Sequence, residues 1–233
     1  MLRPERHPPV RHFILELERL QQKLLEMGGL VERSIHASIA TLIERDERHA
    51  EKVWQHEARI NQSEIEIDDL ATQLLALQQP MARDLRFITV AIKINTDLER
   101  MGDLAVNIVQ RSLKLIEKPE IKPLVDIPKM AKLAEGMVRK SLDSFVTRDA
   151  ELARAVLLSD DDVDQLRTSV YEELVALMQQ DPTVVPQGVD LLLISRHLER
   201  IADHSTNIAE DTLFLVKGID VRHHAEHHSL PGA

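Results

Sequence analysis

The chain has 233 residues, of which 43% are hydrophobic, and it contains no Cys, one Trp, one Tyr and four Phe. The formal net charge of −10 argues against sequence-independent nucleic-acid binding, and the lack of Cys excludes disulfides and thiol catalysis. The opening residues MLRPERHPPVRHF contain no apolar segment typical of a secretory signal, and no apolar run reaches the length of a membrane span. These features favour a core of Leu, Ala, Ile and Val, which suits packed helices.

Helical periodicity runs through most of the chain. Between residues 87 and 108, apolar side chains recur at the i, i+3, i+4, i+7 spacing of an amphipathic helix. A linker with three prolines at 118–128 and a break at 181–186 divide the chain into segments. We therefore predict six helices, over about 10 to the mid-forties, 50–78, 80–117, 128–147, 149–180 and 187–217.

The two halves of this plan are alike, each having three helices with a short second connection. We therefore predict an all-α fold of two tandem three-helix bundles with a pseudo-twofold internal repeat. The first bundle is expected over 1–117 and the second over 118–220. Residues 221–233 are polar and rich in His, have no apolar stripe, and are expected to form a tail outside both bundles.

A repeated polar motif marks the third and sixth predicted helices. NTDLERMGDLAVNIVQ at 95–110 and SRHLERIADHSTNIAE at 195–210 are identical at six of sixteen positions. Both contain Glu–x3–Asp–x3–Asn, a spacing that places three oxygen side chains along one edge of a helix, opposite its apolar stripe. The motif therefore predicts a surface site rather than a site in the bundle core. Its members are Glu99, Asp103 and Asn107 in the first half and Glu199, Asp203 and Asn207 in the second.

The neighbouring helices carry further oxygen side chains at i, i+4 spacing. Glu57 and Asn61 lie as far before the turn near residue 80 as Asp103 and Glu99 lie after it. Asp160 and Asp164 are related in the same way to Asp203 and Glu199 about the turn near Asp181 and Pro182. Crowded carboxylates repel, and a bound cation removes the repulsion. All-oxygen ligands suit Mg, Mn or Fe(III), with Ca possible, while a plain acidic solvent-facing surface is the alternative.

Other polar residues carry weaker signals. His204 is expected to pack at the edge of the apolar side, and Asp211 is a candidate extension of the second ladder. The sequence has no Glu–x–x–His motif of a ferritin-like di-iron core, no Gly-rich phosphate loop and no G-x-S-x-G motif. Because no nucleophile–base pair is visible, we expect a protein that is not an enzyme.

The chain resembles the PhoU family of phosphate-uptake regulatory proteins over essentially its whole length. The most specific segments are QPMARDLRFITVAIKINTDLERMGDLAVNI at 79–108 and LLLISRHLERIADHSTNIAED at 191–211. The resemblance implies two three-helix bundles that hold metal ions, often several together, at surface Glu/Asp–x3–Asp motifs. Carried over, these motifs fall on Glu99/Asp103, Glu199/Asp203, Asp160/Asp164 and Glu57/Asn61. Asn61 departs from the acidic pattern, so we expect the first site to be the weaker one.

The resemblance also implies a role and partners. The family's members act in the cytoplasm as negative regulators of the phosphate-starvation response. They link the ATPase of the ABC-type phosphate transporter to the phosphate-sensing histidine kinase. We therefore expect a non-catalytic, homodimeric, metal-binding adaptor that binds no nucleic acid and meets the membrane only through its partners. The ion is left open among Mg, Mn, Fe and Zn. One alternative is a metal or phosphate buffering protein with multinuclear clusters, and a weaker one is a metallo-phosphatase.

Overall fold

The computed structural model describes residues 9–121 and 126–218, which form α-helices and one short 3-10 helix and contain no strand. The predicted all-α fold is therefore confirmed. The predicted tail at 221–233 lies outside the described residues. The elements in chain order are α1 (Pro9–Glu44), α2 (Arg48–Gln78), α3 (Ala82–Ile116), α4 (Asp126–Thr147), α5 (Ala150–Leu158), α6 (Asp160–Gln180), η1 (Pro182–Val184) and α7 (Val185–Lys217).

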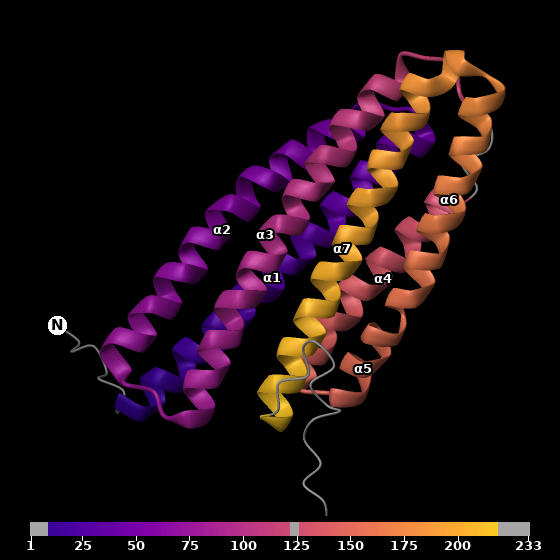
Figure 1. Cartoon of the computed structure of the whole chain (residues 1–233). Helices are drawn as coiled ribbons and strands as arrows, with labels where there is room; N and C mark the ends of the chain where they lie inside the picture. The colour runs from indigo at the N-terminus through magenta and orange to yellow at the C-terminus, as the bar shows by residue number, and fades with distance from the viewer. Residues whose placement is uncertain (1–8, 122–125, 219–233) are drawn as a thin grey trace, which may run out of the picture.

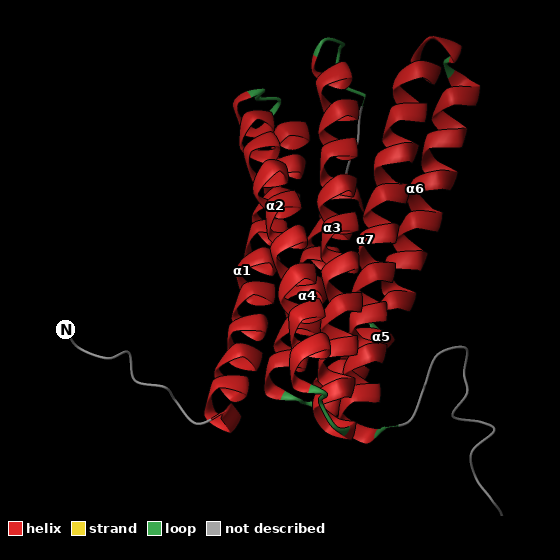
Figure 2. Cartoon of the chain, turned by 90° about the vertical axis from the view of Figure 1, so that its left-hand side faces the viewer, coloured by secondary structure: helices red, strands yellow, loops and turns green. Residues whose placement is uncertain are grey.

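The helices form two three-membered bundles in tandem. Figure 1 shows α2, α3, α7 and α6 side by side in one layer, with α1 and α4 behind it, and Figure 2 shows the same helices from the side. The first bundle consists of α1, α2 and α3, and the second of α4, α7 and the α5–α6 pair. Contacts of α3 with the antiparallel α7, and of α1 with α4, join the bundles, so one hydrophobic core runs through both.

Two contacts show how closely the bundles pack. A side chain at Gly28 of α1 would begin 2.4 Å from Cδ1 of Leu142 in α4, so the glycine permits the close approach of these helices. The rings of Phe87 in α3 and Phe145 in α4 stack with centroids 5.6 Å apart. Both contacts bury apolar surface between the halves. Because aromatic residues are scarce, aliphatic side chains supply most of the remaining core.

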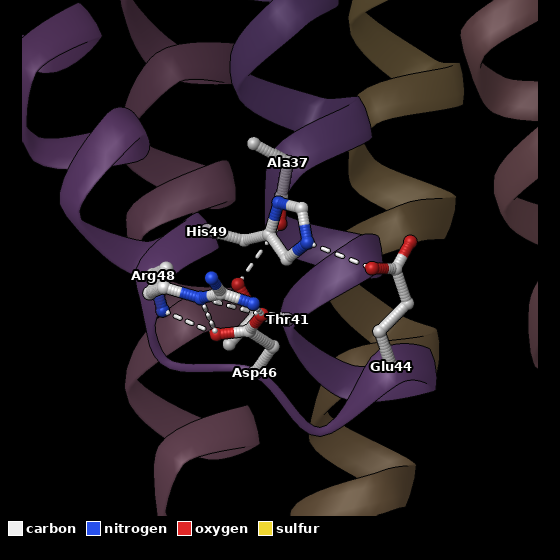
Figure 3. Close-up of polar contacts among 6 residues, drawn as sticks. All are labelled: Ala37, Thr41, Glu44, Asp46, Arg48 and His49. Atoms are coloured by element: carbon white, nitrogen blue, oxygen red, sulfur yellow. Dashed lines mark hydrogen bonds and ion pairs between the residues drawn. The ribbon is translucent and has the colours of Figure 1, made fainter.

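Equivalent turns precede α2 in the first half and α5 in the second, and their matching residues are 103 positions apart. Arg45 and Arg148 both adopt the left-handed conformation, with φ of 52° and 54°. In each case an aspartate follows, and its Oδ1 accepts a backbone N–H two residues on, from Arg48 to Asp46 and from Glu151 to Asp149. Figure 3 shows the first turn, where the Arg48 guanidinium donates to both Asp46 oxygens and holds the pKa of Asp46 down at about 2. The repeat thus extends to the turn chemistry.

The fifth predicted helix, at 149–180, is divided at Ser159 in the structure. The backbone N–H of Ser159 bonds to the carbonyl of Val156, and its hydroxyl bonds to the carbonyl of Ala155, which ends α5 after one tight turn. A new helix, α6, begins at Asp160. The prediction of one continuous helix was therefore wrong at this point, and Asp160 lies in the first turn of α6 rather than in the middle of a longer helix.

No helix of residues 9–121 and 126–218 combines the length with the mean hydropathy that a membrane span requires.

Candidate metal centre

The first set of predicted ligands lies between α2 and α3. The amide of Asn95 donates to the Glu64 carbonyl at 3.0 Å and to Asp68 Oδ1 at 2.9 Å, which fixes the register of the two helices. Two turns further along α3, a Cβ on Gly102 would lie 3.1 Å from Cδ1 of Ile60, so the backbones approach closely here. This packing brings Glu99 beside α2, as the sequence predicted.

Electrostatics show which carboxylates are close together in this first cluster. Burial raises the pKa of Glu99, and the charges of Asp103 and then Glu64 raise it further. Glu64 is not among the predicted ligands. It lies three residues after Asn61 on α2, a spacing that keeps both on one helix face. Asn61 stands where the family pattern has an aspartate, and the Glu64 carboxylate lies less than one turn away.

The second cluster lies between α6 and α7 and is the more crowded one. Burial raises the pKa of Asp160 to about 6, and the neighbouring charges of Asp203, Asp164, Asp161 and Glu199 act in the same direction. Burial likewise raises the pKa of Asp203, with Asp164 adding to the effect. The structure therefore brings the predicted acidic residues of this half near one another on adjacent helices.

An arginine that the sequence analysis did not single out enters the second cluster. Nε of Arg167 lies 3.2 Å from Oε1 of Glu199, within ion-pair distance although not aligned as a hydrogen bond. Burial raises the pKa of Glu199, and the Arg167 charge opposes that rise. Arg167 lies 103 residues after Glu64, so it is the repeat equivalent of Glu64. Extending the repeat comparison one turn beyond Asn61 and Asp164 finds both residues from sequence.

The asparagines at the ends of the two ladders are placed differently from the carboxylates. A residue eight positions along a helix is rotated by about 80° from the first, so the ladder drifts around the helix. Asn207 accordingly reaches the seam between α3 and α7, where its amide donates to Asp97 Oδ1 at 3.3 Å. Asn107 is half-buried on α3. Both stay predicted ligands, but Asn207 is already engaged with a residue of the other half.

Buried polar contacts also join the halves along this seam. His204 and Asp97 are 6% and 8% exposed, and Nδ1 of His204 lies 2.8 Å from Asp97 Oδ1. Lys93 pairs with Asp211 at 2.7 Å. His204 is thus a packed histidine, as expected, and Asp211 faces α3 rather than extending the second ladder.

The clusters are open. Within residues 9–121 and 126–218, no three or more His, Cys, Asp or Glu side chains come close enough together to hold a metal ion as they stand. The ladder carboxylates are half-buried or exposed, because α3 is covered by α1, α2 and α7 and the ladder occupies its remaining side. Their donor set is nevertheless all oxygen and mutually repelling, which is the chemistry that a hard cation relieves.

Comparison with known proteins matches both halves of the chain to one family. The model of the PhoU domain matches this chain twice, at residues 24–112 and 127–212. The chain belongs to the PhoU family. It is 38% identical over 218 residues to the phosphate-specific transport system accessory protein PhoU homolog of Pseudomonas putida, covering 93% of this chain and 85% of that protein. The homolog of the same name from Clostridium acetobutylicum is 36% identical over 90% of this chain and 96% of its own length.

Solved structures agree with this assignment to the PhoU family. The crystal structure of PhoU from Pseudomonas aeruginosa superposes with a TM-score of 0.87 at 38% identity, covering 89% of this chain and all of that one. The phosphate transport system regulatory protein PhoU from Streptococcus pneumoniae gives a TM-score of 0.83 at 32% identity, covering 90% and 99%. The bundle arrangement is therefore that of the PhoU family.

Proposed function

We propose that this protein is an accessory regulator of a phosphate-specific transport system and a negative regulator of the phosphate-starvation response. The observation that carries the proposal is the full-length match to PhoU proteins, whose names place them with that transport system or describe them as its regulators. The similarity covers both halves and both ladders rather than one domain. The same names describe accessory and regulatory proteins, which favours action by contact over catalysis.

In this proposal the protein is a cytoplasmic adaptor between the ATPase of the ABC-type phosphate transporter and the phosphate-sensing histidine kinase. Two features support an adaptor. The fold is a rod of long helices with a shared core, which presents extended surfaces on two similar halves. The carboxylate clusters lie on those surfaces, so a cation bound there would alter the charge that a partner meets.

Metal binding is part of the proposal, and particular residues would hold the ion. The first cluster would use Glu57, Asn61, Glu64, Glu99 and Asp103, with Asn107 as a further predicted ligand. The second would use Asp160, Asp164, Glu199 and Asp203, with Asn207 as a further predicted ligand. A bound Mg, Mn or Fe ion would supply positive charge that neutralises these carboxylates. The ligand residues would keep the bound ion on the α2–α3 and α6–α7 surfaces.

The experiment that tests the adaptor is a co-purification. The full chain, the transporter ATPase and the kinase sensor domain are mixed with Mn²⁺ or with EDTA, and complexes are isolated by size-exclusion chromatography. We expect the chain to co-elute with both partners. Deleting its gene should raise phosphate-starvation gene expression in phosphate-replete cells, and the wild-type gene should reverse this. No complex in either condition, together with unchanged gene expression, would overturn the proposal.

A further inference from the structure

A cleft at one end of the molecule lies far along the helices from the carboxylate clusters. At the lower end of Figure 1, α1 and α3 begin and α7 ends. These three helix ends and the α4–α5 turn enclose a cavity of about 860 Å³. Its walls are partly apolar, with Leu17, Phe87 and Leu215 among them. This volume lies within the range of about 300–1,000 Å³ that is typical of small-molecule sites.

The cleft is basic in an acidic protein. Three arginines line it, Arg83, Arg86 and Arg148, against two carboxylates, while the whole chain carries −10. None of the three guanidinium groups forms an ion pair with another described residue. Arg86 instead lies over the Phe214 ring, 5.3 Å from its centroid. Their charge is therefore available to a ligand.

The internal repeat shows that the arginines of this cleft are arranged differently from their equivalents at the other end. The equivalent of Arg148 in the first half is Arg45, whose Nη2 donates to the carbonyls of Leu115, Ile116 and Lys118 and closes the end of α3. Within residues 9–121 and 126–218, the Arg148 side chain makes no equivalent hydrogen bonds to the end of α7, although it lines the same cleft as Leu215 and Val216.

Two further differences separate this end from its repeat equivalent. The positions equivalent to Arg83 and Arg86 are Thr183 in η1 and Pro186 in the first turn of α7, so neither carries the equivalent charge. In addition, α1 has 36 residues and its repeat equivalent α4 has 22. The extra N-terminal turns of α1 supply the wall that contains Ile14 and Leu17. Apart from Arg148, the cleft thus depends on α3 charges and on an α1 wall that the other end of the molecule does not repeat.

We propose that this cleft binds a phosphorylated small molecule with an apolar ring, of nucleotide size. Guanidinium groups bind phosphate oxygens through paired hydrogen bonds, which explains three arginines around one cavity. The N-terminus of α3 adds the positive end of a helix dipole, since its N-cap residue Met81 provides no side-chain acceptor. Apolar walls favour a ring over a bare phosphate ion, and the volume of about 860 Å³ suits a small molecule better than an extended peptide. The proposal is independent of metal binding and of the adaptor role.

The test is equilibrium dialysis of the full chain with radiolabelled ADP as the probe, in EDTA so that no metal is bound. We expect one ADP per chain, with adenosine and inorganic phosphate each binding at least about tenfold more weakly. Arg83→Gln and Arg148→Gln should each weaken ADP binding about tenfold. Arg154→Gln, on exposed α5, removes the same charge away from the cleft and should leave ADP binding unchanged.

Several results would overturn the proposal. One is the absence of ADP binding at millimolar ADP, and another is equal ADP binding by the wild type and both cleft variants. Loss of ADP binding in Asp203→Ala but not in Arg148→Gln would place the nucleotide at the carboxylate cluster instead. Displacement of ADP by a poly-glutamate peptide but not by ATP would show that the cleft binds acidic peptides. Circular dichroism spectra of each variant check that loss of binding is not loss of folding.

Discussion

Glu64 and Arg167 occupy equivalent positions in the two halves and carry opposite charges, and each acts on the first carboxylate of its ladder. Glu64 raises the pKa of Glu99, whereas Arg167 lies 3.2 Å from Glu199 and opposes the rise in its pKa. The first cluster therefore gains a negative charge where the second gains a positive one. This exchange offsets the substitution of Asn61 for an aspartate, on which the expectation of a weaker first site rested.

The opposite charges of Glu64 and Arg167 predict opposite changes in Mn²⁺ affinity when each is neutralised. Arg167→Gln removes a fixed positive charge, so Mn²⁺ should bind the second cluster about three- to tenfold more tightly. Glu64→Gln should weaken Mn²⁺ binding at the first cluster by a similar factor. Titration followed by the electron paramagnetic resonance signal of free Mn²⁺ measures both. Arg154→Gln is the matched control, because it removes an arginine from α5 outside the cluster. Weaker Mn²⁺ binding in Arg167→Gln would mean that the arginine organises the site rather than competing with the ion.

Asp160 predicts a pH dependence of stability in the metal-free protein. Its folded-state pKa of about 6 lies above the ordinary aspartate value of 3.8, so the folded chain holds this proton more tightly than the unfolded chain. The stabilising contribution is therefore complete below the unfolded pKa and is lost as the pH rises through about 6. Replacing the carboxylate by an amide should remove the loss.

The measurement is thermal unfolding in EDTA at about pH 5 and about pH 7.5. At the higher pH, the free energy of unfolding of Asp160→Asn should exceed that of the wild type by roughly 1 kcal/mol after allowance for solvent screening. This difference corresponds to a rise in Tm of about 2–4 °C. At the lower pH, the difference between the two proteins should shrink. Asp162→Asn serves as the control, because Asp162 lies in the same first turn of α6 but is exposed. A gain that is the same at both pH values would show that repulsion at Asp160 is not its cause.

The two equivalent turn arginines should differ in their effect on stability. Arg45 donates to three carbonyls at the end of α3, so Arg45→Ala should lower the free energy of unfolding by about 2 kcal/mol. Arg148→Ala should change it by less than about 0.5 kcal/mol, because no such bonds are lost. Urea unfolding of both variants measures the difference. Equal losses would show that Arg148 also caps a helix, which would remove the free charge from the proposed ligand cleft.

The sequence predicted the fold well because the repeat and the helical periodicity agree. The ladder at Glu99 and Asp103 was placed on the surface correctly, since its position relative to the apolar stripe follows from helix geometry alone. The break at Ser159 was not predicted, because no Pro or Gly marks it and the hydroxyl of Ser159 bonds back to its own helix. Local hydrogen bonds of this kind compete with helix propensity in ways that periodicity does not reveal.

The candidate site was predicted less completely than the fold. Asn207 appeared in line with Asp203, but the drift of the helix turns it toward Asp97 on α3, and that neighbour depends on how the bundles pack. The end cleft was not predicted at all. Arg83, Arg86 and Arg148 come from segments that only the tertiary structure brings together. Repeat comparison emphasises what the halves share, whereas Arg83, Arg86 and the first turns of α1 have no counterpart of the same kind in the second half.

The most direct test of the account is the metal content of untagged wild-type protein, Asp103→Ala and Asp203→Ala after soaking in Mn²⁺ and removal of free ion. Inductively coupled plasma mass spectrometry gives the ions per chain. The account predicts bound metal in the wild type and a partial loss in each variant, comparable between the two because Glu64 and Arg167 offset the effect of Asn61. Equal, near-zero metal in all three proteins, with Fe as well as Mn, would contradict it.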